Sequence, residues 1–402
     1  MPAPAVPSPP AGLLATRVQD PYAYFAWLRR HAPAHRDRRP GRPTMWQISR
    51  YDDVRALLSD GRLSKDPGRV PGYVAGPAGL NRHLVHADPP DHTRLRTLVN
   101  AAFVPRRVAQ LEPFVADTAN RLLDRIEQLT HVDVIVAFAA PLTFRMICAI
   151  LGVPEELDNA TTRDTLMATI APAPGLNPAR VEGDLHALLD VLIARKRAAG
   201  ERSAVDLLGA LVRASDESGA MSEEELRSTA YLLLLVGHDT TMNLIGNGML
   251  ALLCNPGEAT RLTGPQAGPD LVTTAVEELL RYDSPVRDAT FRCAAEPISL
   301  HGQLIGEGDI VSLLIGSANR DEARFPEADR LDLGRTPNDH LAFGYGPHFC
   351  IGAALARLEG AVAFPLLLER LGPVALAKPA DELHWRPARV MRGLAALPVV
   401  RH

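Results

Sequence analysis

The sequence predicts a mainly α-helical protein with minor β-sheets, folded as a single large domain. Apolar residues recur at helical spacing through most of the 402 residues, whereas runs typical of strands are few and short. No Gly/Ser linker, charge block or repeat divides the chain. We therefore predict a disordered or extended proline-rich lead over residues 1–15, followed by one continuous domain over residues 16–402.

The first half of the domain is expected to alternate helices with loops. A helix is predicted over residues 21–30, then a strand over residues 45–49 and a helix over residues 51–58. Prolines and glycines are too frequent between residues 66 and 87 for a helix, so this stretch is predicted to be a long loop, functional or disordered. Further helical spacing covers 91–101, 106–129, 137–151 and 179–199, with a connector at 171–178.

A long helix is expected at the centre of the molecule. Ser222 and Glu225 have the spacing of a capping box, and the helical pattern continues to about Cys254. At 1.5 Å per residue this helix would be roughly 50 Å long. Its middle is apolar on every face, which predicts that it passes through the core. Short strand-like segments predict small peripheral sheets at 298–300, 309–314, 374–376 and 397–400.

Composition and charge restrict the classes of partner. A net charge of −4 and a pI near 6.4 do not favour binding to nucleic acid or to an anionic membrane. The longest apolar run, residues 231–237, is far shorter than the ~20 residues that span a bilayer, and the N-terminus lacks the features of a signal peptide. The cysteines are far apart and follow no metal-binding spacing, as expected of reduced thiols. We therefore expect a cytoplasmic monomer.

The strongest functional signal is the segment Phe343–Gly352, which reads Phe-Gly-Tyr-Gly-Pro-His-Phe-Cys-Ile-Gly. Its glycines let the backbone turn tightly and approach a flat ligand. Strong helix formers follow Cys350, so the cysteine lies just before a helix N-terminus, where free N–H groups and the helix dipole favour a thiolate. Such a thiolate can ligate haem iron and favour O–O bond cleavage. A buried structural cysteine beside a glycine-rich turn is the alternative.

This segment resembles the haem-binding signature of the cytochrome P-450 family, Phe-Gly-x-Gly-x-His-x-Cys-x-Gly, at every specified position. The resemblance extends over nearly the whole chain and indicates the soluble bacterial class, of the type that tailors actinomycete natural products. It implies a triangular, mainly α-helical fold with haem b between the long central helix and the cysteine loop. It also implies that Cys350 is the proximal iron ligand and that Phe343, Gly344, His348 and Gly352 contact the cofactor.

Polar residues in the middle of the apolar helix need hydrogen-bond partners or a function. Taken alone, Asp239 and Thr240 allow two interpretations: Thr240 bonds a carbonyl one turn earlier and bends the helix, or the acid–alcohol pair delivers protons during dioxygen activation. The run resembles the family's oxygen-activation motif, (Ala/Gly)-Gly-x-(Asp/Glu)-Thr, which favours the second interpretation. Val236 occupies the position of the usual Ala or Gly, and its additional methyl groups should narrow the cavity or displace the helix.

A second group resembles the residues that hold the haem propionates in this family. His92 and Arg96 are four positions apart and share a helix face, which alone would indicate only a polar helix start at the surface. The resemblance assigns both to the propionates, together with Arg292 and His348. Four donors suit two carboxylates, because buried charges must be paired.

Glu278 and Arg281 form a Glu-x-x-Arg pair on one helix face, which alone is weak evidence because most such pairs are solvated. The resemblance makes them part of a structural charge network behind the haem with a later arginine, which we assign to Arg330. The substrate pocket is expected to draw on the 66–87 loop and the 171–180 connector. Its other predicted residues are Leu235, Val236, Val286, Arg287, Ala289, Met391 and Leu394, with Arg287 and Asp288 as polar anchors.

The resemblance implies a monooxygenase that hydroxylates or epoxidises a mostly apolar small molecule, expected to be a secondary metabolite. Its electrons would come from NAD(P)H through a ferredoxin reductase and a ferredoxin. An oxidase that couples rings or carbon skeletons, or a peroxide-driven peroxygenase, would also keep Cys350 and the haem. The family's peroxygenases usually lack the acid–alcohol pair, so Asp239 and Thr240 argue against that class. A haem-binding sensor is the non-enzymatic alternative, and it would not need proton delivery.

Overall fold

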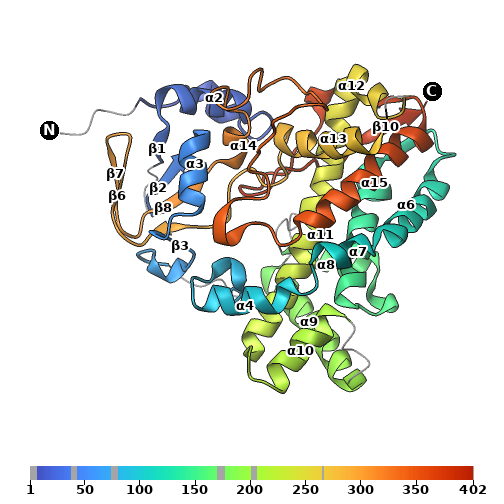
Figure 1. The fold of residues 1–402 in the computed structure, drawn as a ribbon, viewed down its shortest axis with the longest axis horizontal. Helices are drawn as coiled ribbons and strands as arrows, with labels where there is room; N and C mark the ends of the chain where they lie inside the picture. Colours follow the sequence, from blue (N-terminus) through green and yellow to red (C-terminus); the bar gives the residue numbers. More distant parts are fainter. Residues whose placement is uncertain are drawn as a thin grey trace.

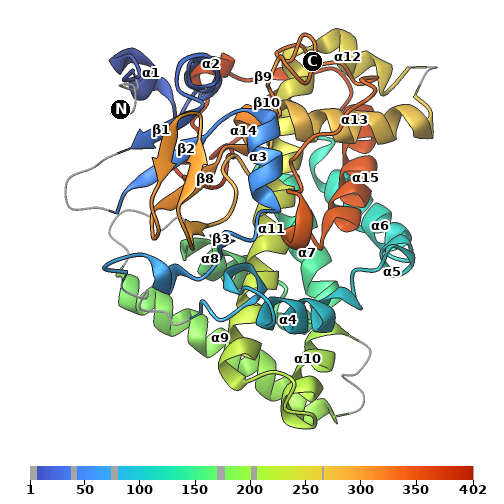
Figure 2. The same cartoon turned by 60° about the vertical axis from the view of Figure 1, so that its left-hand side comes forward.

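The computed structural model describes residues 7–37, 43–73, 80–169, 177–200, 206–264 and 267–401. A β-rich part and a helix-rich part lie on either side of the long helix α11 (Glu223–Cys254) (Figure 1). A second view shows a roughly triangular outline that narrows towards α9 and α10 (Figure 2). The predicted class, mainly α-helical with small sheets, is confirmed.

The β-rich part contains the largest sheet in the described chain, with five strands in the order β1-β2-β8-β5-β3. The strands are β1 (Ala34–Asp37), β2 (Met45–Ile48), β3 (Leu63–Ser64), β5 (Cys293–Ala294) and β8 (Ile310–Leu313). β2 and β8, both predicted, pair in parallel and bury Trp46 and Leu313 in a core of their own. The predicted helices beside them are α2 (Tyr22–His31) and α3 (Tyr51–Leu58).

The predicted helices between residues 91 and 199 are present, with two changes. The segment 106–129 forms two helices, α5 and α6. Pro113 lies in the first turn of α6, where its missing N–H would have no partner in the helix, so a new helix can begin there. The segment 137–151 begins with a π-helical turn at Ile135–Ala139. The helices are α4 (Asp91–Asn100), α5 (Pro105–Ala109), α6 (Glu112–Ile126), α7 (Ala140–Leu151), α8 (Ala160–Ala168), α9 (Pro178–Ala199) and α10 (Leu207–Asp216). α8 and α10 were not predicted.

The central helix α11 begins and ends as predicted. Its capping box is formed: the Ser222 hydroxyl accepts from the Glu225 N–H at 3.2 Å, and the Glu225 carboxylate accepts from the Ser222 N–H at 2.8 Å. Most of its side chains from Leu226 to Leu252 are buried, which confirms its passage through the core. At Gly237 the helix lies so close to α7 that a Cβ atom would be 2.6 Å from the Ile147 side chain.

Three further helices and two small sheets complete the described domain around α11. The helices are α12 (Pro256–Arg261), α13 (Pro269–Tyr282) and α15 (Ala353–Leu371), while the short α14 (Ile315–Ala318) lies beside α2 and α3. The sheets are β4-β10-β9, made of His131–Asp133, Pro398–Arg401 and Val374–Leu376, and β6-β7, made of Ile298–Leu300 and Gln303–Ile305. The strands predicted near residues 298, 374 and 397 are therefore confirmed.

Some predicted segments fall partly outside the described residues. Residues 1–6, 74–79 and 171–176 lie outside the described residues, so the predicted lead, long loop and connector are described only in part. Within the lead, Ala11–Thr16 form helix α1, where an extended or disordered chain was expected. Within the 66–87 loop, two 3₁₀ turns lie at Pro67–Arg69 and Leu84–His86. In the part of the chain described here, no helix combines the length and the apolar character needed to cross a bilayer.

Candidate active site

The cysteine loop closes on itself immediately before α15. The backbone N–H of Cys350 donates to the carbonyl oxygen of Phe343 at 2.8 Å. Gly344 and Gly346 have φ angles of 73° and 76°, a region that side chains disfavour. At Gly346 a Cβ atom would also lie 2.8 Å from the Cβ of Ser59. The backbone of the loop therefore requires the glycines of the motif at these positions.

The protein alone does not favour a thiolate at Cys350. Burial raises the pKa of its thiol, against the opposing effects of the Gly352 N–H and the nearby guanidinium groups of Arg96 and Arg357. The helix N-terminus predicted from the sequence is thus not sufficient to ionise the cysteine. A coordinated metal ion deprotonates a thiol outright, so this position suits a metal ligand better than a free reactive thiolate.

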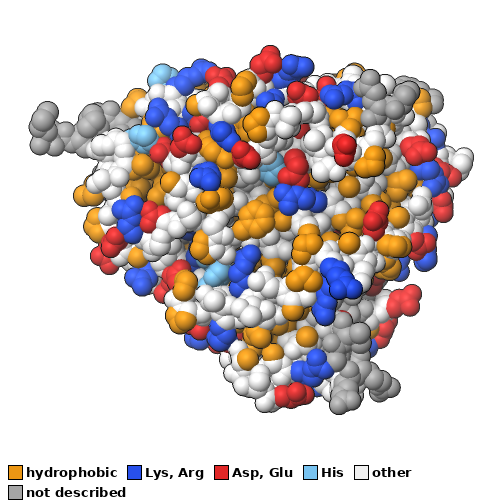
Figure 3. Space-filling view, viewed as in Figure 1, with side chains coloured by type: hydrophobic (Ala, Val, Ile, Leu, Met, Phe, Trp, Pro, Cys, Tyr) orange, Lys and Arg blue, Asp and Glu red, His pale blue; other side chains and the backbone are white. Residues whose placement is uncertain are grey.

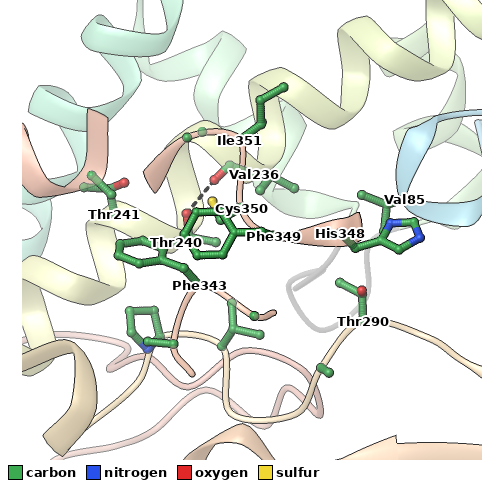
Figure 4. A pocket seen from close by; sticks show the side chains of 18 of the residues that line it. Val85, Val236, Thr240, Thr241, Thr290, Phe343, His348, Phe349, Cys350 and Ile351 are labelled. Atoms are coloured by element: carbon green, nitrogen blue, oxygen red, sulfur yellow. Dashed lines mark hydrogen bonds between the residues drawn. The ribbon is translucent and has the colours of Figure 1, made fainter. Parts of the chain in front are cut away.

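Cys350 faces a cavity of about 1350 Å³, measured with its open mouth, which lies between the cysteine loop and α11. Figure 4 shows Val236 and Thr240 on the α11 side and Phe343 and Phe349 beside the cysteine. The threonine hydroxyls of Thr240, Thr241 and Thr290 contribute polar groups. Much of the remaining wall is apolar and includes Leu84, Val85, Phe103, Leu232, Leu233 and Leu244.

In the middle of α11, Thr240 has features of both the structural and the functional interpretation. The Thr240 hydroxyl donates to the carbonyl oxygen of Val236 at 2.7 Å, as the structural interpretation predicts, yet the residue lines the cavity (Figure 4). Asp239 does not line it. Its fully buried carboxylate Oδ1 lies 2.7 Å from Nη2 of Arg386, which also donates to the Asn243 side-chain oxygen at 2.6 Å. Sequence reasoning missed Arg386, because nothing local connects residues so far apart in the chain.

The four predicted propionate-binding residues gather at one edge of the cavity. Arg96, Arg292 and His348 line it, and the His92 ring lies 4.0 Å from the His348 ring, centroid to centroid. His92 Nε2 and His348 Nδ1 are buried and have no hydrogen-bond partner in the described structure. Burial lowers the pKa of His348 to about 2 and that of Arg292 to about 10, so both would gain from an anionic neighbour. These residues fit the two carboxylates of a haem.

A buried lysine beside this edge was missed by the sequence analysis. Lys65 is only 1% exposed, and its Nζ donates to the Thr290 hydroxyl at 2.6 Å and to the Phe291 carbonyl oxygen at 3.0 Å. Burial lowers the pKa of Lys65 well below its usual value, and Arg292 lowers it further. No motif or spacing marks this lysine, so only the three-dimensional arrangement identifies it as an additional cation near the propionate edge.

Of the three side chains predicted to form a structural triad, the structure brings two together and leaves the third outside. Glu278 and Arg281 are fully buried and 2.7 Å apart. The Arg330 side chain is 61% exposed and pairs with Glu327, so it contributes only its carbonyl oxygen, to Arg281 at 3.2 Å. The third side chain is that of Arg335, whose Nε lies 3.1 Å from Glu278. The chain turns inward five residues later than we assumed.

Only some of the residues predicted for the substrate pocket lie at the cavity. Val236, Val286 and Ala289 line the cavity. Leu235, Arg287, Met391 and Leu394 do not, and the reasons are geometric. At about 100° per residue, the α11 residues that line the cavity cover one half of the helix surface, and Leu235 lies on the other half. Leu394 is buried in the core, and Met391 pairs with Val286 through the backbone. Arg287 and Asp288 face a second cavity.

Residues 2–168 and 270–382 match the family model described as cytochrome P450, written here cytochrome P-450. The chain belongs to the cytochrome P-450 family. The monooxygenase PikC of Streptomyces venezuelae is 42% identical over 384 residues, which cover 94% of this chain and 91% of PikC. The vitamin D(3) 25-hydroxylase of Pseudonocardia autotrophica is 41% identical over 386 residues, covering 95% and 94% of the two chains.

Solved structures agree with this cytochrome P-450 over its whole fold. The tirandamycin C-bound monooxygenase TamI superposes with a TM-score of 0.87 at 38% identity, covering 96% of this chain and 98% of that one. A myxobacterial cytochrome P-450, CYP267B1 in complex with myristic acid, gives 0.90 at 36% identity, with 98% and 100% covered. The protein is therefore a haem-thiolate monooxygenase of the cytochrome P-450 fold, and its cofactor is haem b.

Proposed function

We propose that Cys350 is the proximal ligand of haem b and that this cytochrome P-450 hydroxylates or epoxidises a mostly apolar secondary metabolite. Haem b, when bound, would activate dioxygen, one oxygen atom of which enters the substrate while the other leaves as water with two electrons and two protons. The observation that carries the proposal is a single cavity with Cys350 at one wall, Arg96, Arg292 and His348 at its edge, and α11 at the other wall. Phe343, Gly344 and Gly352 line the same cavity and would contact the macrocycle.

The lining of the cavity supports the substrate class. Its α11 wall offers Leu232, Leu233, Val236 and Leu244, and no carboxylate lines any part of it within the described residues. An apolar molecule would be held by area burial and oriented by few polar groups. Similar proteins are named for such chemistry: a polyketide biosynthesis cytochrome P-450 of Bacillus subtilis at 37% identity and a mycinamicin IV hydroxylase/epoxidase of Micromonospora griseorubida, also at 37%.

Asp239 and Thr240 are proposed to organise proton delivery, with Arg386 positioning the acid. Thr240 lines the cavity and its hydroxyl oxygen keeps a free lone pair, because it donates its proton to the Val236 carbonyl. Asp239 Oδ2, Asn243 Nδ2 and Arg386 Nε are buried without a hydrogen-bond partner in the described structure. Buried polar atoms of this kind commonly bind ordered water. Water at this cluster would connect the carboxylate to the Thr240 side of the helix.

A ferredoxin, reduced by a ferredoxin reductase with NAD(P)H, is proposed as the electron donor. The cysteine loop reaches the surface at Tyr345 and Phe349, which are 39% and 40% exposed. The Arg55 guanidinium lies 4.2 Å from the Tyr345 ring centroid. Arg106 is exposed on α5, which packs against α15, the helix that follows the cysteine loop. On the face viewed in Figure 1, Lys and Arg side chains are interspersed with Asp, Glu and hydrophobic ones (Figure 3). The arginines nearest the cysteine loop suit an acidic electron carrier.

The test is a reconstituted turnover assay with two electron sources. The holoenzyme is screened for substrate-induced spectral shifts with macrolide and linear polyketides, and the hits are incubated with a surrogate ferredoxin, its reductase and NADPH, or with hydrogen peroxide alone. We expect a product one oxygen atom heavier from the ferredoxin reaction, and little from peroxide. A coupled product with no added oxygen would instead assign the enzyme to the oxidase alternative, and peroxide-only turnover would assign it to the peroxygenases.

A further inference from the structure

A second cavity lies behind one wall of the reaction cavity, and a single segment separates the two. Val286 and Ala289 line the reaction cavity, whereas Arg287 and Asp288, between them, line the second. The second cavity measures about 740 Å³ with its open mouth. It is enclosed by residues of the α1–α2 region, by β2 and by the 387–389 loop. The two predicted polar anchors of the substrate pocket thus belong to a separate site.

Positive charge is in excess in the second cavity. Arg17, Arg287 and Arg389 line it, and Asp288 is the opposing carboxylate in the described lining. Arg287 is engaged, since its Nε lies 3.3 Å from Asp288 and its Nη2 donates to the Arg389 carbonyl oxygen at 2.8 Å. The guanidinium groups of Arg17 and Arg389 make no hydrogen bond or ion pair to any described residue. Two cations are therefore available to a ligand.

The remaining lining offers one oriented donor and an apolar surface. Gln47 is 7% exposed, and its side-chain oxygen accepts from the Tyr24 hydroxyl at 2.5 Å. Its amide NH₂ has no hydrogen-bond partner among the described residues, and the side chain lines the cavity. This amide nitrogen is not sealed from the cavity, so it is accessible and can donate to a ligand there. Phe25, Met45 and Leu314 supply apolar contacts beside it.

We propose that this cavity is a binding site for a small molecule that carries a carboxylate or phosphate group on a short apolar chain. Arg17 and Arg389 pair with the oxyanion, because guanidinium groups bind carboxylates and phosphates in a bidentate manner. The Gln47 amide donates to it, and Phe25, Met45 and Leu314 contact the chain. Asp288 opposes the anion and limits the affinity. The site is distinct from the reaction cavity and does not depend on the substrate proposed for that cavity.

The test measures binding while the reaction cavity is blocked. The holoenzyme is saturated with an azole that ligates the haem iron, and hexanoate and hexyl phosphate are titrated by calorimetry. Both probes are titrated into wild type and into the Arg17→Gln/Arg389→Gln double variant. We expect the affinity of the variant to be about tenfold lower or more, because charge-assisted hydrogen bonds are lost. A matched double variant, Arg125→Gln/Arg180→Gln, removes two exposed arginines elsewhere and should bind as wild type does.

Two further variants test whether the ligand is an anion and whether it binds in this cavity. Asp288→Asn removes the opposing charge and should tighten binding several-fold, and Met45→Trp fills the cavity without a change of charge and should abolish it. The azole spectrum and circular dichroism verify that each variant is folded. The proposal is overturned if neither probe binds the azole-saturated enzyme, if the Arg17/Arg389 variant binds as tightly as wild type, or if Asp288→Asn weakens binding. A preference for one probe identifies the headgroup.

Discussion

The two walls of the reaction cavity are built in different ways. On the cysteine side the backbone itself is constrained, since Gly344 and Gly346 have positive φ angles and the Cys350 N–H is bonded to Phe343. On the α11 side the backbone is a regular helix, and side chains such as Val236 determine the surface. The first wall therefore tolerates few substitutions, whereas the second can change its shape without a change of fold. We expect chemistry to be fixed by one wall and substrate choice by the other.

The largest effect is expected at Cys350, on the constrained wall. Cys350→His should retain some haem but lose the red-shifted Soret band that the ferrous–carbonyl form shows with a thiolate ligand, and monooxygenase turnover should fall below detection. The measurement is the reduced carbon monoxide difference spectrum. Cys254→Ser is the control, because Cys254 is free and exposed. Loss of the band on replacement of Cys148, Cys254 or Cys293 would show that the ligand has been wrongly assigned.

The next largest effect is expected behind the same wall, in the buried charge network. Glu278 and Arg281 are fully buried, so Arg281→Ala removes the fully buried partner of the carboxylate, leaves only Arg335 to compensate it, and should destabilise the fold by about 3–5 kcal/mol. Arg335→Ala should cost less than Arg281→Ala, because its own charge is 10% exposed and only part of the network is lost. Chemical denaturation of the holoenzyme, followed at the Soret band, measures both.

Arg330→Ala is the matched control for this network. Its side chain is 61% exposed and pairs only with an exposed glutamate, so the loss should be about 0–1 kcal/mol. Equal losses for Arg330→Ala and Arg335→Ala would contradict the assignment of Arg335 as the third member. The two variants therefore test whether the third member of the network is Arg330, which the family resemblance indicated, or Arg335, which is the more buried of the two.

The sequence predicted the constrained wall better than the variable one, for a physical reason. The Phe343–Gly352 loop is local, and Gly344 and Gly346 are each needed by a turn within ten residues of Cys350. Arg330 and Arg335 lie in one loop, and only packing against Glu278 decides which one turns inward. The Asp239–Arg386 pair joins α11 to the C-terminal region, which no local pattern reveals. The sequence therefore did not predict which distant residues pair or which side of a helix faces the cavity.

Helix phase also explains the errors in the predicted pocket. The apolar character of α11 on every face predicted burial correctly, but it gave no means to decide which apolar residues face the cavity. Leu235 and Val236 are adjacent, and only the second lines it. Similarly, residues 286–290 are divided between two cavities, since Val286, Ala289 and Thr290 line the first and Arg287 and Asp288 the second, although the sequence analysis counted them towards one pocket.

On the variable wall, the largest effect is expected at Thr240. Thr240→Ala should leave haem and substrate binding nearly unchanged, because the hydroxyl bonds only the Val236 carbonyl in the helix. It should divert a large part of the NADPH consumed into hydrogen peroxide, since the cavity then lacks the proposed proton relay. The measurement is the ratio of product to NADPH. Thr240→Ser keeps a hydroxyl and should restore most of the coupling; unchanged coupling in the alanine variant would leave Thr240 with only its helix-bending role.

The smallest effect, and the sharpest test of the variable wall, is expected at Val236. Valine is stiff in a helix because one χ1 rotamer dominates, so its methyl groups cannot move aside for a ligand. Val236→Ala should admit bulkier ligands or change the oxidised carbon, at a stability loss of roughly 0.5–1.5 kcal/mol, since the residue is only partly buried.

Leu235→Ala is the matched control, because Leu235 is the neighbouring residue on α11 but is buried away from the cavity. It should cost about 2–5 kcal/mol and leave the ligand profile unchanged. Spectral titration of a size-graded ligand series and chemical denaturation are carried out on both variants. Stability should change mainly in Leu235→Ala, and ligand preference mainly in Val236→Ala. If both variants shift the ligand profile equally, α11 acts on the substrate through displacement of the whole helix, and its side chains do not act independently.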